Sequence, residues 1–216
     1  PQAASRSHAW SWSTKGSKGV LLLLEIEARP TINDLPGAYN LGVLFTNAPQ
    51  SDLYYGKSGG PGATDPDGYA QHNRTWFLYG GLNQQVTRHA DDPERGMSLS
   101  LSGSYSDQRS NYIHTAVAAS MRYRGLFDAR PADWIGFGLT WMDMSDSYAR
   151  NQRYMNQISG ATNDYDASYQ PVAGHSLNAE LYYRFRPISW LELQPGLQYW
   201  HRPGGVAETQ DAWVVE

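Results

Sequence analysis

The sequence predicts an all-β protein, an antiparallel up-and-down β-barrel that crosses a membrane with its strands. Three observations favour this fold. Apolar and polar residues alternate with a period of two along most of the chain, whereas no long stretch shows the helical period. The alternating segments are about 10 residues long, which suits a tilted crossing of a bilayer. Short connections containing Pro or Asp alternate with longer hydrophilic connections, as in outer-membrane barrels.

The first half of the chain contains four predicted strands, at residues 20–27, 39–46, 76–86 and 97–105. The last is the clearest, because Met97, Leu99, Leu101 and Tyr105 alternate with four serines. Successive side chains of a strand point to opposite faces. This segment therefore has one apolar face and one hydroxyl-rich face.

The second half contains five more predicted strands, at residues 115–124, 135–141, 177–186, 191–200 and 211–215, which makes about nine in all. Short and long connections are expected to alternate strictly along the chain, with the short turns at one end of the sheet and the long loops at the other. Short turns are predicted at 30–36, 89–96, 128–133 and 187–189. Long or irregular loops are predicted at 47–73, 107–112, 145–174 and 201–210.

Alternation alone does not separate a membrane barrel from a soluble β-sandwich, whose apolar faces meet in a shared core. Two features favour the barrel. The polar face carries charges of both signs within strands, such as Glu25 and Arg122. The apolar face places aromatic residues, such as Tyr105 and Tyr123, near strand ends, where an interfacial girdle would lie. A soluble or surface-attached β-sandwich that binds glycans remains the alternative.

The composition excludes several classes of function. The 216 residues contain 17 Lys+Arg and 21 Asp+Glu, for a net charge of −4, which argues against a nucleic-acid partner. The chain has no cysteine, which removes thiol catalysis and Cys-ligated zinc. The longest apolar run covers residues 20–24, whereas a transmembrane helix needs about 20 residues.

No pattern in the chain predicts a catalytic residue, a metal ligand or a cofactor. Residues 65–68, Asp-Pro-Asp-Gly, invite a calcium interpretation, but Trp76 occupies the position where an EF-hand loop needs a glutamate, so a plain turn is favoured. The six histidines lack metal-ligand spacing. The carboxylate pairs Asp143/Asp146 and Asp164/Asp166 are expected to be solvated loop residues. Trp10 and Trp12 are expected in a loop or as an interfacial anchor.

Several segments resemble the carbohydrate-selective porin family typified by OprB. Residues 35–43, LPGAYNLGV, are similar to that family's LPG-x-Y-x-LG strand, and residues 82–88, LNQQVTR, to its Q-x-V-x-R strand. Residues 123–138 are similar to its GLF turn and the strand that follows. Residues 180–205, which include WLELQPGLQYW and end in PGG, carry the most specific resemblance. These segments follow the family's order along most of residues 35–215.

The resemblance implies an integral protein of the bacterial outer membrane and a barrel of about sixteen strands. It implies passive, carbohydrate-selective diffusion of mono- or oligosaccharides rather than an enzyme activity. Residues 1–216 are then expected to form one partial barrel domain that lacks the first strands and the end of the last. The expected partners are sugars, outer-membrane lipid and the remaining strands, supplied by the missing part or by another chain; a homo-oligomer is left open.

The candidate lumen-facing residues are the polar and aromatic side chains on the polar faces of the predicted strands. They are Glu25, Glu27, Arg29, Asn40, Asn83, Gln85, Arg122, Arg124, Glu180, Tyr182, Arg184, Arg186, Glu192, Gln194, Gln198 and Trp200. The arginine pairs 122/124 and 184/186 are the strongest candidates, because two like charges on one face need acidic partners or a ligand.

Overall fold

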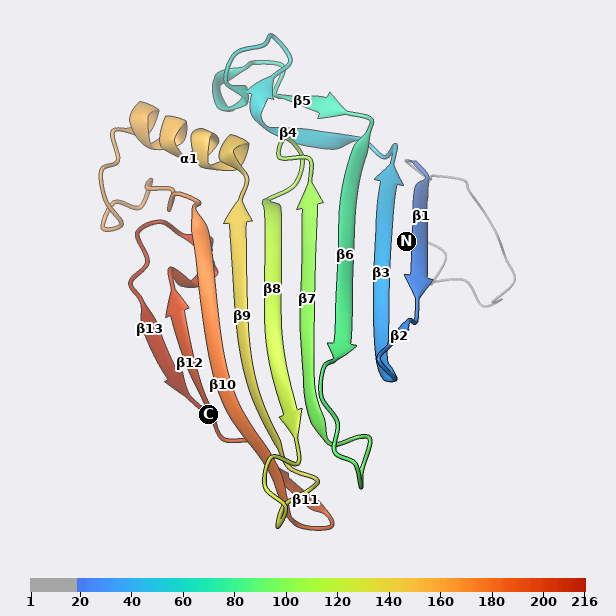
Figure 1. The fold of residues 1–216 in the computed structure, drawn as a ribbon. Helices are drawn as coiled ribbons and strands as arrows, with labels where there is room; N and C mark the ends of the chain where they lie inside the picture. Colours follow the sequence, from blue (N-terminus) through green and yellow to red (C-terminus); the bar gives the residue numbers. More distant parts are fainter. Residues whose placement is uncertain (1–18) are drawn as a thin grey trace, which may run out of the picture.

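The computed structural model describes residues 19–216, which form one large antiparallel sheet that is curved and open (Figure 1). Nine strands follow one another along this sheet. They are β1 (Leu21–Ala28), β3 (Leu35–Thr46), β6 (Thr75–Gln85), β7 (Gly96–Ser106), β8 (Ile113–Arg124), β9 (Trp134–Met144), β10 (His175–Ile188), β12 (Gly196–His201) and β13 (Ala212–Val215). Two short strands, β2 (Thr31–Ile32) and β11 (Leu191–Leu193), extend β3 and β10 at one end. The predicted meander of about nine strands is confirmed.

The strand register explains why the sequence alternates. Asn83 pairs with Ser100, Ser100 with Ser120, and Ser120 with Gly138. The neighbouring row runs through Leu82, Leu101, Ala119 and Leu139. Directly paired residues project to the same face of a sheet. Each ladder therefore collects small and polar side chains on one face and apolar side chains on the other.

The apolar face of the sheet is not covered by the rest of the described chain. Leu22, Leu101 and Leu181 are 51%, 46% and 49% exposed. The buried apolar cluster instead comprises Ala149, which belongs to a helix at one end of the sheet, together with Val172 and Ala173. The alternative β-sandwich is therefore wrong, since a sandwich would bury this face between two sheets.

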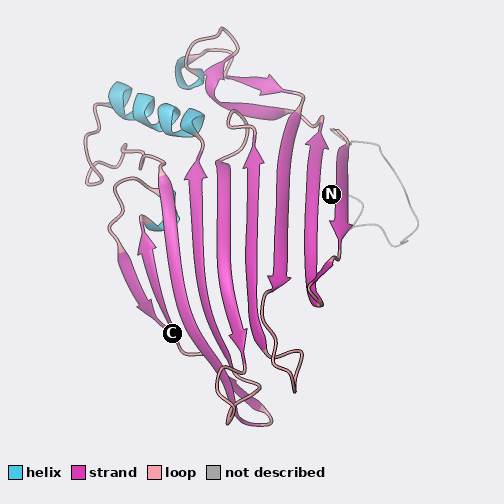
Figure 2. Ribbon diagram, viewed as in Figure 1, coloured by secondary structure: helices cyan, strands magenta, loops and turns pink. Residues whose placement is uncertain are grey.

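The two ends of the sheet differ in the structure of their connections (Figure 2). One end, the short-turn end, has connections without a helix and carries the β2 and β11 extensions. The other, the long-loop end, carries helix α1 (Asp146–Ser159) and a two-stranded sheet of β4 (Gln50–Gly56) and β5 (Tyr69–His72). Short 3-10 turns lie at Gly62–Thr64 and Pro203–Gly205. Within residues 19–216, no helix is long and apolar enough to cross a membrane.

Three details of the predicted connections are corrected by the structure. The loop predicted at 145–174 contains α1, and the loop predicted at 47–73 contains the β4–β5 pair. Connection length does not alternate strictly, because the segment 107–112 at the long-loop end is shorter than the turn 86–95 at the short-turn end. The anchor predicted at Trp10 and Trp12 lies outside the described residues.

Candidate functional site

The polar face of the sheet brings most of the candidate lumen residues onto one surface. All but Arg29 and Gln194 lie within strands. The register joins them in rows across the sheet: Glu27 pairs with Asn40, and Glu180 pairs with both Gly138 and Gln198. These rows supply hydroxyl, amide and charged groups from one edge of the described sheet to the other.

The candidates near β1 are bound to their neighbours in two groups. Glu25 accepts hydrogen bonds from the Tyr79 hydroxyl (2.5 Å) and from Asn40 Nδ2 (3.4 Å). Glu27 pairs with Arg29 at 2.7 Å. The acidic groups of this edge are thus occupied by neighbours on the same wall, far across the sheet from the arginine pairs on β8 and β10.

Other candidates are also engaged locally. Asn83 Nδ2 donates to Ser100 Oγ (2.7 Å), and Gln85 Nε2 donates to backbone carbonyls of the following turn. Near the C-terminal edge, Trp200 Nε1 donates to Gln198 Oε1 (2.9 Å). Amides and indoles held in this way line the wall while contributing few free hydrogen-bonding groups.

The two predicted arginine pairs come together at the short-turn end. Arg186 Nε donates to Glu192 Oε2 (2.9 Å), and Arg184 Nε donates to Gln194 Oε1 (2.8 Å). Arg124 forms an ion pair with Glu94, a residue of the turn between β6 and β7. Each of these three arginines therefore has a partner. Partners are expected, because two arginines two residues apart on one face repel each other.

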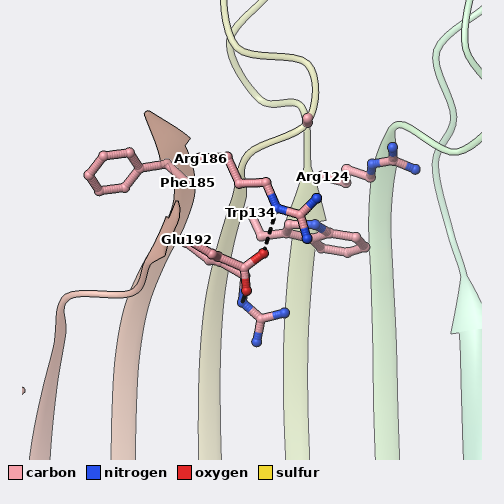
Figure 3. A pocket seen from close by; sticks show the side chains of 7 residues that line it. Arg124, Trp134, Phe185, Arg186 and Glu192 are labelled. Carbon is pink, nitrogen blue, oxygen red and sulfur yellow. Dashed lines mark hydrogen bonds and ion pairs between the residues drawn. The ribbon is translucent and has the colours of Figure 1, made fainter. Parts of the chain in front are cut away.

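Trp134 is a member of this cluster that the sequence prediction missed. Its ring lies 5.9 Å from the Arg122 guanidinium and 5.7 Å from that of Arg124. Figure 3 shows the ring between Arg124 and the Arg186–Glu192 pair, whereas Phe185 points away from them. The expected strand began at Ile135, and starting it one residue earlier would have placed Trp134 on the polar face. The ring lines a cavity of about 260 Å³ together with Arg124, Arg184, Arg186 and Glu192.

A second cavity, of about 400 Å³, lies further along the same face. Arg122, Glu180 and Tyr182 line it, and their side chains have no hydrogen-bond or ion-pair partner within residues 19–216. Its remaining wall consists largely of small groups, including Ser102 and Thr140. A guanidinium, a carboxylate and a phenol thus face one water-accessible space with their donors and acceptors free.

The backbone beneath Tyr182 explains how its ring reaches this position. Gly136 is paired directly with Tyr182 across β9 and β10. A Cβ atom at Gly136 would lie 2.3 Å from Tyr182 Cζ, so only glycine leaves room for the ring to lie against β9. The Arg184 guanidinium lies 5.9 Å from the same ring.

The residues considered for metal binding or catalysis lie apart from these cavities. Asp65 accepts hydrogen bonds from the Ser58 backbone and hydroxyl and from the Asp67 backbone, which lower the pKa of the Asp65 carboxyl and close a loop turn. Asp166 accepts in the same way from Ser168. Among residues 19–216, no group of three potential His, Asp or Glu ligands could hold a metal ion.

The fold and the polar face together define a class of protein. A single antiparallel meander with an uncovered apolar face and a polar face rich in charged groups is the wall of an outer-membrane pore. Known proteins agree with this description. The family model described as "Carbohydrate-selective porin, OprB family" matches residues 1–216. The chain therefore belongs to the OprB family of carbohydrate-selective porins and is an integral protein of the outer membrane.

Two curated relatives and two solved structures are similar to this chain. Porin B of Pseudomonas aeruginosa is 36% identical over 220 residues, which cover 100% of this chain and 48% of the relative. A putative porin, QuiX, of Acinetobacter baylyi is 30% identical over 216 residues, which cover 98% of this chain and 46% of the relative. The chain thus spans about half the length of these relatives, both of which are named as porins.

The high-pH structure of Pseudomonas putida OprB matches with a TM-score of 0.88 and 33% identity, over 95% of this chain and 49% of that chain. The low-pH structure of the same protein matches with a TM-score of 0.52 and 27% identity, over 85% of this chain and 42% of that chain. The open sheet of residues 19–216 therefore corresponds to part of a porin structure.

Proposed function

We propose that this chain forms part of the wall of a water-filled pore through which mono- or oligosaccharides diffuse passively. The barrel is closed by further strands, from the same polypeptide or from another chain. An open sheet edge in lipid would leave backbone groups unpaired at a cost of several kcal/mol each. The polar face then lines the lumen, and the apolar face contacts lipid.

The observation that carries this proposal is the cavity lined by Arg122, Glu180 and Tyr182. A sugar presents hydroxyl groups, which both donate and accept hydrogen bonds, and apolar C–H faces. The free guanidinium donates, the free carboxylate accepts, and the tyrosine ring offers a surface for C–H groups. Pore selectivity arises from lining groups of this kind, and diffusion through the pore requires no catalytic group.

The other candidate lumen residues serve two roles in this proposal. The networks of Glu25 with Asn40 and of Gln198 with Trp200 make the wall polar but offer few groups to a sugar, because these groups are already hydrogen-bonded to one another. The arginine cluster around Trp134 sets the charge at the short-turn end. Porin turns at the periplasmic side are short, so this end faces the periplasm.

The test is single-channel recording with the assembled channel, purified in detergent together with the strands that close it. Glucose should reduce the conductance. Arg122→Gln or Glu180→Gln should each raise the half-blocking glucose concentration by about fivefold, since a hydrogen bond to a charged, water-accessible group is lost. The matched control is Arg74→Gln, an exposed arginine at the long-loop end, which should leave the block unchanged. Glucose block that is equal in all four proteins would contradict the assignment of this cavity.

A further inference from the structure

The arginine cluster around Trp134 contains more positive charge than its partners neutralise. Arg184 and Arg186 share one carboxylate, that of Glu192, with Nε···O distances of 3.7 and 2.9 Å. Arg124 is paired with Glu94. Arg122, which contacts the same tryptophan ring, has no acidic partner among the described residues. Four guanidinium groups thus meet two carboxylates at this point of the wall.

The hydrogen-bonding groups of this cluster are only partly used. Arg184 and Arg186 donate from Nε alone, so their terminal Nη groups make no hydrogen bond within residues 19–216. Their side chains are 43% and 66% exposed, which leaves these groups open to the cavity. A guanidinium carries five N–H donors in a planar fork that fits a carboxylate with two parallel bonds.

The cationic cavity also adjoins the proposed sugar cavity. The Arg122 guanidinium belongs to the sugar cavity yet reaches the Trp134 ring, and the Arg184 guanidinium, which lines the cationic cavity, reaches the Tyr182 ring. A single polyhydroxylated molecule lying along the wall would meet hydroxyl-binding groups first and excess positive charge next, toward the short-turn end.

We propose that the cavity lined by Arg124, Trp134, Arg184, Arg186 and Glu192 is a subsite for the carboxylate of a sugar acid, such as an aldonate or a uronate. This proposal rests on the proposed sugar channel and extends its permeants to anionic sugars. The free Nη groups of Arg184 and Arg186 bind the carboxylate, and Glu192 holds the two side chains in place. The Trp134 ring forms the floor of the cavity.

Single-channel recording with gluconate and glucose as blockers tests this proposal at constant ionic strength. The measured quantity is the ratio of the half-blocking concentration of glucose to that of gluconate. Arg186→Gln should lower this ratio by about fivefold, the upper range for a water-exposed ion pair. Glu192→Gln should raise the ratio, because the glutamine amide oxygen can still accept from Arg186 Nε while the competing negative charge is removed. Arg74→Gln is the control for a general loss of positive charge and should leave the ratio unchanged.

The outcomes separate the two proposals. Opposite changes in Arg186→Gln and Glu192→Gln support the carboxylate subsite. Glucose block without gluconate block, or a ratio equal in all variants, overturns the subsite and leaves the sugar channel standing. Gluconate block without glucose block supports the subsite and overturns the neutral-sugar channel. If neither compound reduces the conductance, both proposals are wrong.

Discussion

Arg95 joins two turns at the short-turn end of the sheet. Its side chain is buried, with the residue only 4% exposed, and it lies just before β7. Its guanidinium donates to the Gly125 carbonyl (2.7 Å from Nη2) and to Asp128 Oδ1 (2.7 Å), both in the turn between β8 and β9. The guanidinium lowers the pKa of the Asp128 carboxyl. This contact fixes the turns that flank the arginine cluster of the polar face.

Replacing Arg95 by alanine should destabilise the assembled barrel. The substitution removes three hydrogen bonds and leaves the Gly125 carbonyl without its partner. We expect a temperature of unfolding several degrees below that of the unmodified protein, measured by the gel mobility of heated samples. Arg88→Ala is the matched control, because Arg88 in the same connection is 45% exposed and should tolerate the change. Equal unfolding temperatures for both variants would contradict the role of Arg95.

At the residue scale, the period of two predicted that the candidate residues within strands share one face of the sheet, but not which of their groups are free. Arg124 is neutralised by Glu94, a turn residue that no strand pattern links to it. Arg122, two residues earlier on the same strand, has no acidic partner among residues 19–216. Such differences depend on side-chain reach across neighbouring strands and turns, which the sequence does not specify.

At the element scale, helix α1 is the feature that the sequence prediction missed. Its buried positions are Ala149, Gln152 and Asn156, so two of the three carry amides rather than apolar groups. Gln152 accepts from the Ala173 backbone and donates to the Pro171 carbonyl, while Asn156 bonds both backbone groups of Gln170. A helix that is held in place by hydrogen bonds from amide side chains has no apolar stripe, so its sequence lacks the helical period of apolar residues. Its boundaries are set by the Ser145 cap and the left-handed Gly160.

Gln152→Ala should therefore loosen α1 although no apolar contact is lost. The backbone groups of residues 171 and 173 would lose their partners, at about 1–3 kcal/mol for each buried polar group left unpaired. The expected result is faster proteolytic cleavage within the segment 145–174. Gln157→Ala, on the exposed side of the same helix, provides the control and should be cleaved at the unmodified rate. Identical cleavage rates for the two variants would show that the amide contacts do not hold the helix.

The β4–β5 pair is a second element of the long-loop end whose stability should depend on pH. Asp52 is 3% exposed and pairs with His72 Nε2 at 2.6 Å. Burial opposes the charge of the Asp52 carboxylate, but hydrogen bonds from His72 and from the backbone of Tyr54 and Tyr55 outweigh it. The pKa of Asp52 is therefore lowered. A depressed carboxyl pKa stabilises the folded state above the ordinary pKa, and this contribution is lost as the pH falls below it.

The β4–β5 pair should accordingly become mobile only in acid. The chain has no cysteine, so Lys57→Cys allows a single spin label on the exposed segment after β4. The label should show constant mobility from pH 7 to about pH 5 and rising mobility below about pH 4, near the ordinary carboxyl pKa. Asp52→Asn should weaken this pH dependence but not abolish it, because Asp65, whose lowered pKa stabilises the turn beside the label, also titrates in acid. Asp67→Asn, on an exposed turn, should leave the pH dependence unchanged. A spectrum that stays unchanged in acid would refute the role of Asp52.

At the scale of the whole molecule, the described chain is one curved sheet whose outer strands, β1 and β13, each pair on one side only. The sequence predicted the number of strands and their meander because turns and alternation are local signals. Closure of the barrel leaves no local signal in the sequence, because it depends on pairing between strands that are far apart along the chain. The sheet matches about half of a solved porin, which agrees with a wall that needs further strands to close.

The central claim is that one face of this sheet faces water and the other faces lipid. Single cysteines along β7, at Leu99, Ser100, Leu101 and Ser102, test it most directly in the assembled channel. A charged, water-soluble thiol reagent added during conductance recording should react at positions 100 and 102 and lower the conductance, while positions 99 and 101 should not respond. Reaction at 99 and 101, or a response without the period of two, would contradict the assignment of the polar face to the lumen.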